Sequence, residues 1–170
     1  AVSVTVPAGF RASGVTAGLK ASGKPDLALV VNDGPLAVAA AVYTSNRCVA
    51  HPVRWSREVT ADGSVRAVVL NSGGANCYTG PDGYATTAAT AARVGAGVGC
   101  PATDIVVCST GLIGDLLDRE KLAAGVDAAV AALSGDGGRA AAEAIMTTDT
   151  HPKTVVRTAP GGWSVAGMAK

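Results

Sequence analysis

Apolar residues occur along the chain in short blocks, separated by turns rich in glycine and proline. Several blocks are apolar throughout, which is typical of strands covered on both faces of a sheet. The blocks that predict strands before the last third of the chain are 27–31, 37–43, 53–57, 66–71 and 105–108. The turn Asn32-Asp33-Gly34-Pro35 indicates a hairpin that joins the first two of them.

Helical patterns alternate with these strands from the middle of the chain onward. Segment 84–94, rich in alanine and threonine, predicts a helix whose small side chains pack closely on a sheet. Asp118 is a good N-cap, and the apolar residues after it recur at helical spacing: Leu122, Val126, Val130 and Leu133. Segment 139–146 predicts a third, short helix, and segments 154–158 and 163–169 predict a hairpin. The alternation predicts an α/β fold.

Composition and charge exclude several classes of protein. Of 170 residues, 48% are hydrophobic and 16% are charged, so we expect one folded domain rather than a disordered chain. The net charge of +1, without a clustered basic face, argues against a nucleic-acid partner. No apolar run approaches the ~20 residues of a membrane span, and the N-terminus lacks the order of a signal peptide. We therefore expect a cytoplasmic protein with no membrane partner.

The cysteines and histidines form no recognisable metal motif. The chain contains Cys48, Cys77, Cys100 and Cys108 without a C-x-x-C pair, and both histidines, His51 and His151, precede a proline. Cys48 and His51 could provide two zinc ligands, but a second pair is missing. We expect no metal, and buried thiols rather than a disulfide.

The segment Cys108-Ser109-Thr110-Gly111 is the strongest candidate for chemistry. Cys108 would need a base or a positive field to act as a nucleophile, and none is local. Ser109 lacks the flanking glycines of a hydrolase elbow. The Thr110 hydroxyl beside the Gly111 N–H offers two donors for a developing oxyanion. A strand-to-loop turn with capping hydroxyls explains the same residues, and the local sequence alone favours this structural interpretation over the oxyanion donors.

Two other polar segments and one lysine could be either structural or part of a site. Thr147-Thr148-Asp149-Thr150 either ends a helix through side-chain hydrogen bonds or contacts a polar substrate. Segment 71–76 lacks the lysine and spacing of a phosphate-binding loop, so we interpret it as a turn near the site. Lys170 is a lone cation on the last predicted strand, where it could simply discourage strand addition.

Taken in order, these segments resemble the N-terminal, or α, chain of the ornithine acetyltransferase family, also called bifunctional glutamate N-acetyltransferases. The segments that carry the resemblance are 7–12, 71–76, 108–114, 145–153 and 167–170. Ser-Thr-Gly-Leu-Ile-Gly at 109–114 and Met-Thr-Thr-Asp-Thr at 146–150 are the most specific of them. The resemblance implies a layered α-β-β-α sandwich. It also implies that 1–170 form a single α-chain domain, which a second, β chain completes.

The resemblance also implies an activity. Members of the family are made as one precursor that cleaves itself before a threonine. This threonine begins the β chain and is the nucleophile of a ping-pong reaction, which moves an acetyl group from N2-acetylornithine to glutamate in arginine biosynthesis. The family works without a cofactor, and we expect an α2β2 heterotetramer. Whether acetyl-CoA is a further donor stays open. An N-terminal threonine needs no histidine, because its own α-amino group can accept the hydroxyl proton.

By the same resemblance, four residues of this chain belong to the site. Thr110 and Gly111 match the oxyanion hole, with Thr110 giving its hydroxyl and Gly111 its N–H. Thr147 and Lys170 match substrate-binding positions, where the lysine ammonium would pair with a carboxylate; Thr148 is the alternative to Thr147. Two other hypotheses remain, namely a cysteine or serine hydrolase that works alone and a non-catalytic ligand-binding subunit.

Overall fold

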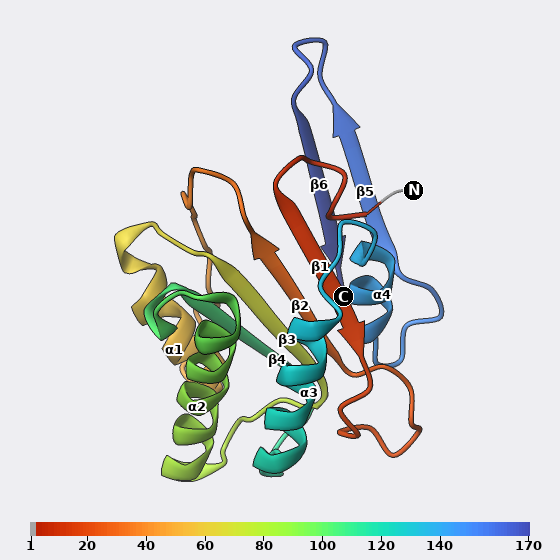
Figure 1. Ribbon diagram of the computed structural model, residues 1–170. Coiled ribbons are helices and arrows are strands. Elements are labelled where there is room, and N and C mark those ends of the chain that lie inside the picture. The colour runs from red at the N-terminus through yellow and green to blue at the C-terminus, as the bar shows by residue number, and fades with distance from the viewer. Residues whose placement is uncertain (1–2) are drawn as a thin grey trace.

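Residues 3–170, which the computed structural model describes, form a four-stranded mixed sheet, a two-stranded sheet and flanking helices (Figure 1). The larger sheet has the order β1-β2-β3-β4, with two antiparallel pairs followed by a parallel pair. Its strands are β1 (Phe10–Val15), β2 (Leu27–Asn32), β3 (Ala67–Gly74) and β4 (Ile105–Leu112). The smaller sheet is the hairpin of β5 (Lys153–Thr158) and β6 (Ser164–Ala169). This architecture confirms the predicted α/β class.

Three helices cover one face of the larger sheet: α1 (His51–Val59), α2 (Gly80–Val98) and α3 (Arg119–Ala131). Helix α2 connects the parallel strands β3 and β4, and two short 3₁₀ turns, η1 (Thr60–Asp62) and η2 (Ala102–Asp104), precede those strands. The predicted N-cap is confirmed, because the Asp118 side chain accepts hydrogen bonds from the backbone of the first helical turn. The main core lies between these helices and the sheet and consists mostly of aliphatic residues: Leu27, Leu29, Val31, Ala67, Val69, Ala91, Val94, Ile105, Val107, Leu122, Val126 and Ala129.

The opposite face is covered over β1, β2 and part of β3. Helix α4 (Gly138–Ala144) packs there through small residues, and Met168 of β6 adjoins this second cluster. The backbones approach so closely that a Cβ on Gly14 would lie 2.0 Å from the Ala140 carbonyl oxygen. Over β4 the face is open, and Cys108 is exposed there.

The predicted strand at 53–57 is wrong, because this segment belongs to helix α1. Pro52 stands in the first turn, where a missing N–H costs nothing. Trp55 donates from Nε1 to the Ile105 carbonyl at 2.9 Å, and the Ser56 hydroxyl donates to the Val107 carbonyl at 2.8 Å. Five residues were too short a window to separate the two periodicities.

The predicted strand at 37–43 is also wrong. This segment makes one isolated bridge, between Val38 and Ser64, and Val42 is 98% exposed. The turn at 32–35 therefore joins no hairpin, and the antiparallel neighbours of β2 are instead β1 and β3. β1 was not predicted, because its sequence FRASGV has large apolar residues only at its two ends. Its small residues contact α4.

The remaining strands and helices agree with the prediction apart from their ends. The predicted turn at 71–76 begins later, because β3 continues to Gly74. Within residues 3–170, none of the helices has the length and hydrophobicity that crossing a bilayer requires.

Candidate active site

The four predicted site residues lie around one cavity of about 490 Å³, at the carboxyl ends of the parallel strands β3 and β4. They come from the end of β4, from the segment after α4 and from the end of the chain after β6. The residues that line the cavity are Lys20, Gly73, Thr110, Gly111, Leu112, Thr147, Thr148 and Lys170. Thr148, the alternative to Thr147, therefore shares the same cavity.

Gly111 has a backbone conformation and surroundings that exclude a side chain. Its φ is +139°, and a Cβ would lie 2.6 Å from both the carbonyl carbon of Gly73 and the backbone nitrogen of Gly74. Gly73 is its direct partner in the parallel register. Because no side chain covers it, the Gly111 backbone remains accessible to a ligand in the cavity.

The N–H of Gly111 falls on the outer edge of the sheet. β4 is an edge strand, and its Ile105 and Val107 carbonyls point outward to Trp55 and Ser56 of α1. Along a strand the backbone groups of every second residue point the same way, so Gly111 shares this direction. Its N–H is directed away from β3 and is available as a donor.

Thr110 and Ser109 point to opposite faces of β4, because side chains alternate along a strand. The Ser109 hydroxyl donates to Asn71 Oδ1 at 2.5 Å, on the face that α2 and α3 cover. Thr110 lies on the open face and lines the cavity. Of the two adjacent hydroxyls, only that of Thr110 is placed to reach a ligand there.

Asp149 connects the segment after α4 with the end of the chain. Its carboxylate pairs with Lys153, accepts the Thr147 N–H at 3.2 Å and lies 3.6 Å from the Lys170 ammonium. The hydrogen bond from Lys153, then the Thr147 N–H, and the charges of Lys153 and Lys170 hold the pKa of Asp149 well below its usual range. The ionised carboxylate thereby keeps Thr147 and Lys170 beside one another.

The structure brings no histidine to Cys108 or Ser109. Among residues 3–170, neither histidine hydrogen bonds to them; His51 begins α1, and the exposed His151 shares a hydrogen bond with Thr150. Protein atoms around the sulfur raise the pKa of the Cys108 thiol by burial, although the residue as a whole is exposed. A raised pKa disfavours the reactive thiolate, which weakens the hypothesis of a cysteine hydrolase.

The cysteines are less buried than predicted. Within residues 3–170 all four are free thiols; Cys77 is buried and Cys100 half-buried, but Cys48 and Cys108 are exposed. That part of the chain contains no group of three or more side chains arranged to hold a metal ion.

Lys20 and Gly73 were not identified from the sequence as site residues. Lys20 stands in a polar loop between β1 and β2, with no motif around it, and reaches the cavity only through the fold. The polar segment that follows the apolar start of β3 was the one signal that pointed to Gly73.

The sequence profile of the ArgJ family matches residues 11–170, and the chain belongs to this family. It is 55% identical over 172 residues to the arginine biosynthesis bifunctional protein ArgJ of Bifidobacterium longum, and 57% identical over 169 residues to that of Streptomyces coelicolor. Each alignment covers 99% of this chain and 44% of the relative, so the chain spans less than half the length of these curated relatives.

Two solved structures are similar over nearly the whole chain. One is ornithine acetyltransferase from Mycobacterium tuberculosis complexed with ornithine, with a TM-score of 0.98 and 52% identity, covering 99% of this chain and 91% of that chain. The other is the arginine biosynthesis bifunctional protein argJ from Bacillus halodurans, with a TM-score of 0.88 and 32% identity, covering 98% and 88%. The predicted family is confirmed.

Proposed function

We propose that this chain is the α chain of a two-chain acetyltransferase of arginine biosynthesis, which moves an acetyl group from N2-acetylornithine to glutamate. The observation that carries the proposal is the single cavity formed by Thr110, Gly111, Thr147 and Lys170. This cavity offers hydrogen-bond donors and a cation, as acyl transfer to and from an amino acid requires. A nucleophile with its own base would come from the partner chain.

In the proposed reaction the N-terminal threonine of the partner attacks the acetyl carbonyl of N2-acetylornithine. Its hydroxyl proton passes to its α-amino group and then to the nitrogen of the departing ornithine, leaving an acetyl ester on the threonine. In the second half the amine of glutamate attacks this ester and the C–O bond to the threonine breaks. The amine proton passes through the α-amino group to the threonine oxygen, which gives N-acetylglutamate and the free threonine. In both halves the carbonyl oxygen becomes negative, and the Thr110 hydroxyl and the Gly111 N–H stabilise it.

Substrate binding is the proposed role of Thr147 and Lys170. Both substrates carry an α-carboxylate, which the Lys170 ammonium can bind by a charge-assisted hydrogen bond. The Asp149 carboxylate lies 3.6 Å from that ammonium and also accepts the Thr147 N–H, which keeps the two residues close. The contact is the same in the ground state and in the transition state, so it contributes to binding rather than to the chemical step.

The relative lengths of the chains support a precursor that is divided in two. The same residues cover 44% of the curated relative from Mycobacterium tuberculosis but 91% of the solved chain from that organism, so the solved chain is much shorter than the curated protein. Three exposed apolar side chains lie at the end of β4 and just after it: Leu112, which lines the cavity, Ile113 and Leu116. A partner chain would cover them. In this proposal the chain, 1–170, is one domain of an α-β-β-α sandwich that assembles as α2β2.

Purification of the full-length protein tests the proposal directly. Denaturing mass spectrometry and N-terminal sequencing are expected to find two chains, the second of which begins with threonine, and the complex is expected to transfer acetyl from N2-acetylornithine to glutamate. An uncleaved protein that transfers acetyl would contradict the self-cleavage. A cleaved complex without this activity would contradict the substrates.

Lys170→Ala is expected to raise the KM for N2-acetylornithine by about 10-fold while kcat changes little, because one charge-assisted hydrogen bond is lost equally from ground and transition states. Steady-state kinetics of the assembled enzyme measure both constants. Lys121→Ala is the matched control, because Lys121 is an exposed lysine that does not line the cavity. An unchanged KM in Lys170→Ala would refute the binding role.

A further inference from the structure

The loop between β1 and β2 is organised by one buried carboxylate. Asp26 is fully buried, and its Oδ1 accepts the Ala17 N–H at 2.6 Å. Its Oδ2 accepts the N–H groups of Leu19 and Lys20 at 2.6 and 2.9 Å. Charge-assisted hydrogen bonds of this kind are among the stronger ones in proteins, so the backbone is held in place up to Lys20.

The same loop is anchored beside the oxyanion donors. The Ser72 N–H donates to the Asp26 carbonyl at 2.8 Å. The next residue, Gly73, has a φ of +119°, and a Cβ there would lie 3.0 Å from the Leu19 carbonyl oxygen. Gly73 is the strand partner of Gly111, so the loop packs directly beside Gly111. This contact places Lys20 at the edge of the cavity.

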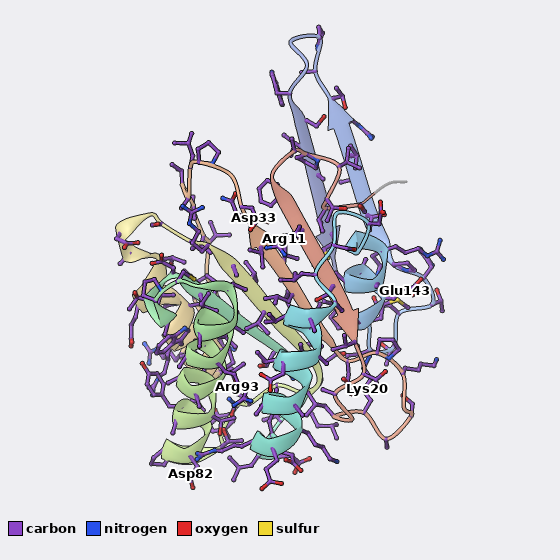
Figure 2. The ribbon with its side chains drawn as sticks, viewed as in Figure 1. Arg11, Lys20, Asp33, Asp82, Arg93 and Glu143 are labelled. Atoms are coloured by element: carbon purple, nitrogen blue, oxygen red, sulfur yellow. The ribbon has the colours of Figure 1, made fainter. Side chains whose placement is uncertain are left out.

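The Lys20 ammonium uses two of its three hydrogens within the protein. It donates to the Pro25 carbonyl at 2.8 Å and to the Met146 carbonyl at 2.6 Å. The second bond crosses to the segment that carries Thr147, and Figure 2 shows Lys20 in the loop that follows β1. One ammonium hydrogen remains for a ligand in the cavity that Lys20 lines.

The cavity carries more positive than negative charge. Two of its lining residues, Lys20 and Lys170, are cationic, and no acidic residue lines it. The nearest carboxylate to Lys170, that of Asp149, is already paired with Lys153. Burial lowers the pKa of Lys20; Asp26 opposes this shift, whereas Lys24 and Lys170 add to it. An anionic group between the two lysines would relieve this repulsion.

We infer that Lys20 is a further substrate-binding residue, which donates its third ammonium hydrogen to the α-carboxylate of the amino acid substrate opposite Lys170. The inference rests on the proposed function for the identity of the substrate. The hydrogen bonds of Lys20 to the Pro25 and Met146 carbonyls hold its ammonium in place, so the carboxylate binds a positioned donor rather than a mobile side chain.

The test compares ornithine with ornithinamide, which lacks the carboxylate charge, by calorimetric binding to the assembled enzyme. In the wild type ornithine is expected to bind more tightly than the amide. In Lys20→Met the preference is expected to fall by about 10-fold, because the charged donor is gone while the length of the side chain is kept. Lys20→Arg keeps the charge and is expected to retain most of the preference.

Lys24→Met is the matched control, because Lys24 is an exposed lysine of the same loop that does not line the cavity. The preference of this variant for ornithine over ornithinamide is expected to equal that of the wild type. A purely structural Lys20 would weaken both ligands by the same factor in Lys20→Met, and that result would overturn the inference. If Lys20→Met does not fold, Lys20→Gln serves in its place, and an unchanged preference there would count against the inference equally.

The binding measurement also separates the two proposals. If the wild-type complex transfers no acetyl group but the preference for ornithine depends on Lys20, the proposed reaction fails and the carboxylate contact stands. If acetyl transfer occurs and the preference is unchanged in Lys20→Met, the reaction stands and the role of Lys20 is refuted.

Discussion

Thr110→Ala is expected to slow acetyl transfer about 100-fold while the KM for N2-acetylornithine changes little. In the proposed reaction the hydroxyl stabilises the charge that develops on the carbonyl oxygen, so its loss is expected to raise the barrier without weakening the bound ground state. Thr110 is half-exposed at the cavity, on the face of β4 that no helix covers, so the protein should fold without the hydroxyl. Steady-state and single-turnover kinetics of the assembled enzyme measure the effect.

Two variants of the same strand are controls for this prediction. Thr110→Ser keeps the hydroxyl and is expected to recover most of the rate. Cys108→Ala removes the thiol from the same face of β4 and is expected to leave the rate near that of the wild type. A loss shared equally between KM and the rate constant would make Thr110 a ground-state ligand, and inactivity of Cys108→Ala would revive the cysteine hydrolase.

Gly111→Ala is expected to abolish measurable acetyl transfer and to lower the free energy of unfolding by about 3 kcal/mol. Two costs add here, because alanine is strained at a φ of +139° and its Cβ would lie 2.6 Å from the backbone of Gly73 and Gly74. Backbone atoms cannot move aside as a flexible side chain can, so β3 and β4 must separate at Gly111, the proposed oxyanion donor.

Gly114→Ala is the matched control for the cost of strain alone. Gly114 also has a positive φ, +98°, but a Cβ there would meet nothing within 4 Å. Its expected loss is about 1 kcal/mol, with activity largely retained. Chemical unfolding and the transfer assay measure both variants, and equal effects at the two glycines would show that the close contact with Gly73 is unimportant.

Where the local pattern agreed with the packing, the elements were predictable. The long segment after Asp118 repeats its apolar residues at helical spacing, and its N-cap forms as expected. Segment 53–57 was wrongly predicted as a strand, because five residues are too few to distinguish a helical from a strand pattern. It belongs to helix α1, which has Pro52 in its first turn. β1 has no large apolar residue in its interior, because close packing against α4 selects small residues such as Ala12 and Gly14 there.

The sequence by itself determined the α/β class, the capped helix after Asp118, the C-terminal hairpin and, through its motifs, the family and the four candidate residues. Only the tertiary structure decided that Thr110 faces the cavity while Ser109 faces the helices, because strand register sets which side chains share a face. It also decided that Lys20 reaches Met146, 126 positions away in the chain. Contacts between residues so distant arise from packing, and no local pattern encodes them.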